Sequence, residues 1–339
     1  MRLPTVALFA LVASLASVGA DEGELYAVIA STSRFWFNYR HDADALTVYD
    51  QLRRAGVPDS RIILMLSGGA ACDDRNGVPG TVYHIGSTNA RHLRVPGDER
   101  LCNLHRDGTE VDYRGAEVTS DAFRRVLTGR HAPGTPASQQ LNSGANDRVL
   151  VFMSGHGGDG FSKFQDIDIL STEDVAATLD DAHARGRFRE LLFIIDSCQA
   201  ATVLEAVVTP GVLSIASSAR NQNSYALGPS DMSLGIAMVD RFSFTLGQFL
   251  DAGNDNALTR YDRERVRNPA QKEEWVKWLR ATPLTRLIAA APRNFLAADI
   301  VTRDQSFGRP LRSVMLADFF LPRRAALRAV ALGSGAAGD

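Results

Sequence analysis

The sequence lacks the long apolar runs and the dense basic stretches that place other chains in membranes or on nucleic acids. Beyond residue 20 it has no run of about 18 or more consecutive apolar residues, so no further membrane-spanning helix is expected. No cluster of Lys and Arg interleaves with aromatic residues, and the net charge is only -2, which argues against a nucleic-acid partner. Asn-x-Ser/Thr glycosylation sites and a C-terminal lumenal-retention tetrapeptide are also missing. Retention in a lumenal compartment would therefore depend on an assembly.

Cysteine is scarce as well, and its count is odd. The three residues are Cys72, Cys102 and Cys198. In an oxidising compartment an odd number leaves at least one thiol free or bonded to another chain. The composition therefore indicates a reactive thiol or an intermolecular disulfide.

The first twenty residues have the pattern of a secretory signal peptide. Arg2 supplies the positive start, residues 6–17 form an apolar run, and Val18-Gly19-Ala20 is a small-residue cleavage site. A membrane anchor is the alternative, but the apolar run is too short to cross about 30 Å of hydrocarbon. We expect the mature chain to start at Asp21.

Strand-like and helix-like segments alternate along the chain as far as residue 250. Short apolar runs predict strands at residues 25–31, 61–66, 148–153, 190–196 and 212–216. Amphipathic or capped stretches predict helices at residues 43–55, 119–127, 171–184 and 242–250. This alternation predicts a three-layer α/β fold with a mainly parallel central sheet flanked by helices on both faces. We assign residues 21–250 to this domain and residues 251–339 to a C-terminal extension of unknown role without a transmembrane helix.

Two of the predicted strands end in residues that can carry nucleophilic chemistry. His156 lies in Ser-Gly-His-Gly-Gly after residues 148–153, and Cys198 lies in Asp-Ser-Cys after residues 190–196. The carboxyl ends of parallel strands meet at one edge of a sheet, so the imidazole and the thiol are expected side by side. A thiol with an ordinary pKa of about 8.5 needs such a neighbour, or a helix N-terminus, to form thiolate near neutral pH.

Two further residues complete the predicted site. The backbone N–H of Gly157 is placed to stabilise a tetrahedral oxyanion, and Asn38 is a candidate to orient His156 through a hydrogen bond. A lone buried cysteine is usually a small core residue, and a lone histidine is usually structural. Their joint occurrence at consecutive strand ends, among glycines, favours the catalytic interpretation.

Three segments resemble the legumain-type, caspase-like cysteine peptidases. They are SRFWFNYRH at residues 33–41, GHGGDGFSKFQD at residues 155–166 and LLFIIDSCQ at residues 191–199. More narrowly, residues 25–250 are similar to the catalytic subunits of glycosylphosphatidylinositol (GPI) transamidases. The resemblance implies the caspase-like version of the three-layer α/β fold.

The resemblance also implies roles for individual residues. Cys198 would be the nucleophile, His156 the base and acid, Asn38 the third member and Gly157 the oxyanion donor. Four residues would line the substrate pocket, with ordinary loop and strand-end roles as the alternative: Arg40, His41, Ser217 and Ser218.

Outside the catalytic site, the resemblance implies a partner contact and a metal site. Cys72 matches a cysteine that forms an intersubunit disulfide. Asp59, Glu110 and Asp112 match a structural calcium site, and hard carboxylate oxygens suit that ion, although a solvated acidic patch is the alternative. The chemistry itself would need no cofactor. The chain departs from many relatives by its extra Cys102, a longer loop at residues 86–103 and the absence of a C-terminal transmembrane helix.

The resemblance implies a transamidation. The enzyme would cleave the C-terminal GPI-attachment signal of precursor proteins through a Cys198 thioester and transfer the carbonyl to the ethanolamine amine of a GPI lipid. It would work in the endoplasmic reticulum lumen as a soluble chain, held at the membrane by other transamidase subunits. A legumain-like asparaginyl endopeptidase, active alone, is the alternative enzyme, and a scaffold that merely retains the fold is the non-enzymatic alternative.

Overall fold

The computed structural model describes residues 23–85, 101–105, 108–228, 235–251 and 269–323. The predicted signal peptide lies outside the described residues.

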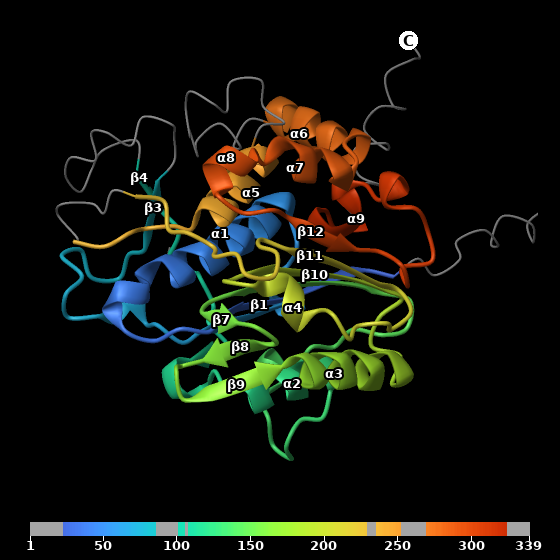
Figure 1. Ribbon diagram of the computed structural model, residues 1–339, viewed down its shortest axis with the longest axis horizontal. Coiled ribbons are helices and arrows are strands. Elements are labelled where there is room, and N and C mark those ends of the chain that lie inside the picture. Colours follow the sequence, from blue (N-terminus) through green and yellow to red (C-terminus); the bar gives the residue numbers. More distant parts are fainter. Residues whose placement is uncertain (1–22, 86–100, 106–107, 229–234, 252–268, 324–339) are drawn as a thin grey trace, which may run out of the picture.

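A seven-stranded sheet forms the centre of the molecule (Figure 1). Its strands, in spatial order, are β12 (Val301–Arg303), β11 (Val212–Ala216), β10 (Glu190–Asp196), β6 (Arg148–Ser154), β1 (Leu25–Ser31), β2 (Ile62–Leu66) and β5 (Tyr113–Arg114). Every neighbouring pair is parallel except β11 and β12. The predicted mainly parallel sheet is confirmed, and the five predicted strands all belong to it.

Helices cover both faces of the sheet (Figure 1). One face carries α1 (Tyr39–Ala55), α5 (Arg241–Asp251), α6 (Pro269–Ala281), α7 (Leu284–Ala290), α8 (Arg293–Leu296) and α9 (Leu316–Phe320), and the other carries α2 (Ser120–Thr128), α3 (Thr172–Ala184) and α4 (Ala200–Val203). Along β1, Ala27 and Ile29 belong to the first core while Val28 and Ala30 belong to the second. A strand buried on both faces reads as one continuous apolar run, which is why the sequence revealed it. The predicted three-layer α/β architecture is confirmed.

Two small sheets stand beside the central one. The first pairs β3 (Tyr83–Ile85) with β4 (Leu101–Asn103), and the second consists of β7 (Gly157–Gly158), β8 (Phe161–Phe164) and β9 (Asp168–Ser171). The second sheet starts directly after His156. It therefore lies next to the predicted catalytic edge.

Residues from the predicted C-terminal extension pack on the catalytic fold. Trp275 and Leu279 from α6 and Phe319 from α9 are buried in the same core as α1, and β12 closes one edge of the central sheet. The division at residue 250 stays a prediction, but these elements have a structural role. None of the helices in the described part of the chain has the length and apolar composition needed to cross a membrane.

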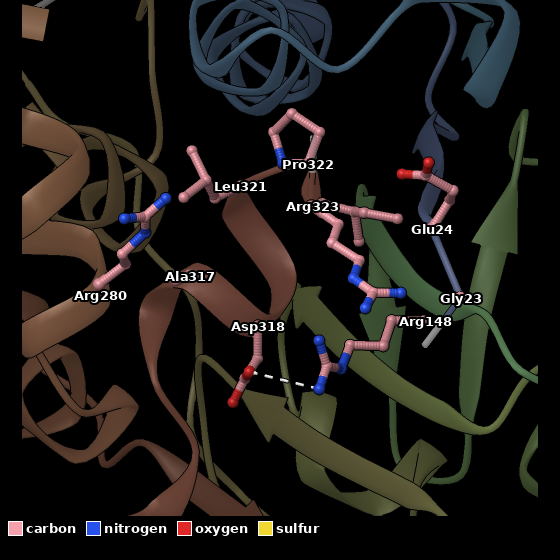
Figure 2. Close-up of a pocket in the computed structure, with 10 residues that line it drawn as sticks. Gly23, Glu24, Arg148, Arg280, Ala317, Asp318, Leu321, Pro322 and Arg323 are labelled. Atoms are coloured by element: carbon pink, nitrogen blue, oxygen red, sulfur yellow. Dashed lines mark ion pairs between the residues drawn. The ribbon is translucent and has the colours of Figure 1, made fainter. Parts of the chain in front are cut away.

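Ion pairs join α9 to the edge of the sheet opposite the predicted site. Arg148 at the start of β6 lies 3.0 Å from Glu190 and 3.5 Å from Asp318, while Arg309 contacts the same two carboxylates at 2.7 and 2.8 Å. A cavity of about 150 Å³ opens beside this network, with Arg148, Arg280 and Asp318 among its lining residues (Figure 2). The network ties the C-terminal elements to β6 and β10.

Candidate active site

The register of two central strands brings His156 and Cys198 together. At the ends of β6 and β10, Ser154 pairs with Asp196, and the Gly155 N–H donates to the Asp196 carbonyl at 3.2 Å. Each reactive residue therefore lies two positions beyond a residue of one register pair. A side-chain carbon placed on Gly157 would lie only 2.9 Å from the Cys198 carbonyl oxygen, so a glycine is needed for this approach.

Asn38 fixes the orientation and the tautomer of His156. Its Nδ2 donates to the Arg34 carbonyl at 2.8 Å, so its Oδ1 is the atom that lies 2.9 Å from His156 Nε2. An amide oxygen can only accept, and Nε2 must therefore carry the proton. This leaves the lone pair on Nδ1 available to accept a proton. The prediction that Asn38 orients His156 agrees with this geometry.

Burial keeps both members of the pair neutral in the resting enzyme. It raises the pKa of the half-buried Cys198 thiol, and it lowers the pKa of His156, with the nearby Arg40 charge acting in the same direction. The thiol lies 3.8 Å from the Ser224 carbonyl. We therefore expect the proton to pass from Cys198 to His156 as the thiol attacks, rather than a stable ion pair before substrate binds.

The first two backbone N–H groups of α4, the short helix after Cys198, donate to Ser218. The N–H of Ala200 donates to Ser218 Oγ at 3.1 Å, and the N–H of Ala201 donates to the Ser218 carbonyl at 3.0 Å. Because Ser218 takes up both of these amides, they give no support to a thiolate at Cys198. Gly157 does lie beside Cys198, as an oxyanion donor must, and that role stays a prediction.

The two predicted pocket serines hold the backbone of the turn that contains Cys198. Ser217 and Ser218 are buried, and their hydroxyls donate to the Ser197 carbonyl at 3.3 and 2.7 Å. The N–H of Ser197 donates back to Ser217 Oγ at 3.2 Å. These bonds give the side chains a positioning function, while contact with substrate stays a prediction for both residues.

The other two predicted pocket residues share the Asp240 carboxylate near His156. Arg40 Nε lies 3.0 Å from Asp240, and His41 Nε2 lies 3.4 Å from the same carboxylate. The His41 ring stands edge-on to His156 at 5.1 Å, and burial followed by the Arg40 charge lowers the pKa of His41 to about 4. Arg40 retains 17% side-chain exposure, so it is the member of the pair that substrate can reach.

A buried group of three carboxylates lies close to His156 and Cys198, and sequence reasoning missed it. Asp44, Asp196 and Asp240 each place an oxygen within 4.8 Å of the others. Asp44 accepts from Ser154 Oγ at 2.8 Å, and Asp196 accepts from Ser243 Oγ at 2.6 Å. Hydroxyl and amide donors thus occupy these oxygens, and the group works as a hydrogen-bond network that joins α1, β6, β10 and α5.

The three carboxylates ionise over different pH ranges. Burial alone would raise the pKa of Asp240, but the hydrogen bond and charge of His41 and the charge of Arg40 outweigh it and lower the pKa to about 2. Burial, then the Asp240 charge, raises the pKa of Asp196 to about 6. Burial and both neighbouring charges raise the pKa of Asp44 well above its usual range. Asp240, opposite Arg40, is therefore the first of the three to ionise as the pH rises.

Sequence comparisons agree with this geometry. The peptidase C13 family model matches residues 25–285. The chain belongs to the peptidase C13 family. It is 43% identical over 246 residues to the GPI-anchor transamidase of Schizosaccharomyces pombe, which covers 72% of this chain and 61% of that protein. It is 36% identical over 332 residues to the human GPI-anchor transamidase, which covers 94% of this chain and 75% of that one.

The chain spans only part of the curated relatives that it matches. For the GPI-anchor transamidase of Saccharomyces cerevisiae, at 40% identity, the match covers 68% of this chain and 53% of the relative. Among solved structures, caspase-1 from Spodoptera frugiperda matches with a TM-score of 0.35 and 11% identity, over 67% of this chain and 69% of that one. A TM-score this low supports no conclusion about the fold. The strand order and layers of the chain itself describe the architecture of this C13 peptidase.

Cys72 of the C13 peptidase is a free, exposed thiol. It ends the 3-10 turn Ala70–Cys72 and lines a mostly apolar cavity of about 190 Å³ together with Leu66, Val82 and Val111. An exposed thiol beside an apolar hollow is accessible to a cysteine of another chain. The intersubunit disulfide itself stays a prediction.

The three acids of the predicted calcium site lie in one electrostatic neighbourhood. Burial, followed by the charges of Asp59 and Glu110, raises the pKa of Asp112 to about 7. Asp112 Oδ2 accepts from the Leu64 N–H at 2.8 Å, and Asp59 Oδ1 accepts from the Tyr49 hydroxyl at 2.6 Å. Among the described residues, the carboxylate oxygens of Asp44, Asp196 and Asp240 lie within 4.8 Å of one another, and those of the three predicted calcium ligands do not. A bound cation would nevertheless relieve the repulsion between their negative charges.

Proposed function

We propose that this C13 peptidase is the catalytic subunit of a GPI transamidase. The observation that carries the proposal is the oriented neutral pair of Cys198 and His156 in a chain that is 36 to 43% identical to GPI-anchor transamidases. Its substrates are precursor proteins with a C-terminal GPI signal and a GPI lipid with a free ethanolamine amine. No cofactor takes part in the chemistry.

The first half of the reaction forms a thioester. Cys198 Sγ attacks the carbonyl of the attachment residue while its proton passes to His156 Nδ1, and the Gly157 N–H stabilises the oxyanion. His156 then donates that proton to the departing amide nitrogen, the C–N bond breaks, and the signal peptide leaves. The precursor is now bound to Cys198 through a C–S bond.

The second half transfers the acyl group to the lipid. The ethanolamine amine attacks the thioester carbonyl, and His156 Nδ1 accepts the proton that the amine loses. The C–S bond breaks as the amide forms, and the proton returns to the Cys198 sulfur. The enzyme ends in its starting state, provided that water does not attack the thioester first.

Product analysis separates this proposal from a legumain-like endopeptidase. The purified complex, given precursor and GPI lipid, should yield a protein whose new C-terminus is an amide of ethanolamine, detected by mass spectrometry. A legumain-like enzyme would instead leave a free carboxylate after Asn or Asp, and the isolated chain would suffice. A free carboxylate from complex and isolated chain alike would contradict the transamidase proposal.

The proposal includes a complex in the endoplasmic reticulum lumen, with partner subunits that hold the chain at the membrane and one that bonds to Cys72. We expect Cys72→Ser to abolish the disulfide-linked band on non-reducing gels and to reduce anchoring only in part, because non-covalent contacts remain. Cys198→Ala is the matched cysteine control and should keep the band. Persistence of the band in Cys72→Ser would exclude Cys72 as the linking residue.

A structural calcium ion at Asp59, Glu110 and Asp112 is part of the same proposal. Calcium at about 100 times its Kd should stabilise the fold by about 2.7 kcal/mol, measured as a rise in melting temperature. Protons compete for Asp112, whose pKa is about 7, so the rise should be largest above pH 7 and vanish as the pH falls below it. Asp112→Asn should remove the effect, whereas the exposed Asp121→Asn should not. An equal response in Asp112→Asn would rule out this site.

A further inference from the structure

An exposed aromatic surface with a positive charge adjoins the catalytic asparagine. Phe35 and Phe37 are 46% and 61% exposed, and their rings stack at 5.7 Å with 15° between their planes. The guanidinium carbon of Arg34 lies 4.6 Å from the centre of the Phe35 ring. We call Arg34, Phe35 and Phe37 the aromatic platform. Two exposed phenylalanines in contact are unusual on a surface that binds nothing.

The backbone of the platform belongs to the same hydrogen-bond network as the catalytic residues. The Arg34 carbonyl accepts from Asn38 Nδ2 at 2.8 Å, and the Phe35 carbonyl accepts from the Asn38 N–H at 3.0 Å. Arg40 Nη1 donates to the Phe37 carbonyl at 3.1 Å. The platform is therefore held at a fixed distance from the His156 ring that Asn38 orients.

Phe35 has a strained backbone. Its φ of 77° and ψ of 146° lie in a region that is nearly restricted to glycine. This strain persists although the side chain remains 46% exposed. Retained strain next to reactive residues is typical of a functional position.

The charge of Arg34 is available for a ligand. Within the described residues, no carboxylate lies within 4.0 Å of its guanidinium, whereas Arg40 is paired with Asp240 at 3.0 Å. A guanidinium can stack on an aromatic ring, and it binds phosphate with two parallel hydrogen bonds. A flat aromatic face suits the C–H face of a pyranose sugar.

We propose that the aromatic platform binds the phosphoethanolamine-bearing sugar of the acceptor lipid, with the phosphodiester on Arg34 and the sugar against Phe37. The proposal rests on the transamidase function. Two carbons separate the attacking amine from its phosphate, so this phosphate must lie close to the thioester at the moment of attack. Next to Asn38, the platform offers an exposed aromatic surface and a cation that no described carboxylate pairs with. Asn38 in turn contacts the catalytic base at 2.9 Å.

The hydrophobic tail of the precursor's GPI signal is the other candidate for an apolar surface, and it does not fit the platform. A GPI signal separates the attachment site from its hydrophobic tail by a polar spacer of about 8–12 residues. An extended spacer spans roughly 26–40 Å at about 3.3 Å per residue, which carries the tail well past a platform beside Asn38. The attachment residue itself is small and has no need of two phenylalanines.

Two variants in the full complex test the proposal. Arg34→Gln removes the charge. Phe35→Gly removes one ring of the stack, and this variant should fold well because glycine adopts a φ of 77° without strain. Each should raise the KM for the GPI acceptor about tenfold or more. Release of the signal peptide by hydrazine, a small amine without phosphate or sugar, should proceed at the wild-type rate in both. Val208→Ala, another exposed apolar residue, is the matched control and should change neither rate.

The outcomes separate the two proposals. If hydrazine-dependent release falls as much as transfer to GPI, the platform contacts the precursor, and the acceptor assignment is wrong. An unchanged KM for GPI in both variants would overturn it as well. If the wild-type complex forms no GPI-linked product, the transamidase function itself fails, independently of the platform.

Discussion

Cells that carry Cys198→Ala as their only copy should accumulate uncleaved precursor and display no GPI-anchored protein at the surface. The substitution removes the sulfur that forms the thioester, and losing a nucleophile of this kind lowers turnover by a factor on the order of 10⁶. The fold should remain, because the side chain is only half-buried and a small truncation costs about 1 kcal/mol. The ratio of precursor to anchored protein, measured by pulse-chase labelling, gives the result.

Cys72→Ala is the matched control for this experiment. It removes the other free cysteine in the described chain, which is exposed and lies on a different loop. We expect it to leave thioester chemistry intact, so precursor should still be cleaved. Normal anchoring in cells with Cys198→Ala would contradict the enzymatic proposal and support the scaffold interpretation.

The sequence predicted the dyad because its signals are local. Each reactive residue directly follows an apolar strand that is buried on both faces, and the chain order of strands and helices indicates which ends meet. The structure adds the register: Ser154 pairs with Asp196, which places His156 and Cys198 level with each other. That pairing depends on tertiary contacts between β6 and β10, and no pattern within either strand determines it.

The buried carboxylates could not be predicted in the same way. Asp44 lies on α1, Asp196 ends β10 and Asp240 precedes α5, so positions far apart in the chain meet only after folding. Polar residues inside α1 also blurred its periodicity. Asp42 and Asp44 are both buried there, and the helix begins at Tyr39 although its apolar pattern indicated a start near residue 43.

The C-terminal elements carried weak signals for a related reason. Strand β12 has three residues, all only partly buried, and it pairs with the main sheet in the antiparallel direction. Helix α9 has five residues and depends on Arg148 and Arg309 for part of its attachment. Short elements that are stabilised by long-range contacts leave little periodicity in the sequence.

Replacing His156 should cause the second-largest loss of turnover, after replacement of the nucleophile. His156→Ala removes the group that takes the thiol proton and later protonates the leaving nitrogen, and a positioned acid–base residue contributes about 10²–10⁴ in rate. Because the pKa of the buried Cys198 thiol is raised, little thiolate forms at neutral pH without the imidazole. The loss should appear in kcat, with the KM for precursor largely unchanged. A variant with more than half of the wild-type kcat would exclude His156 as the base.

Asn38→Asp tests the orientation of His156 through the pH dependence of the same reaction. In the wild type His156 must be neutral to act, and burial lowers its pKa below the ordinary value of about 6.5, so the rate should fall only when the pH drops below that value. Aspartate preserves the acceptor 2.9 Å from Nε2 but adds a negative charge, which stabilises the protonated ring and should raise its pKa. The acid limb of the kcat profile should therefore move to higher pH, while Asn38→Ala should lower kcat at all pH values because the ring is no longer held. An unshifted acid limb in Asn38→Asp would show that Asn38 does not contact the catalytic histidine during turnover.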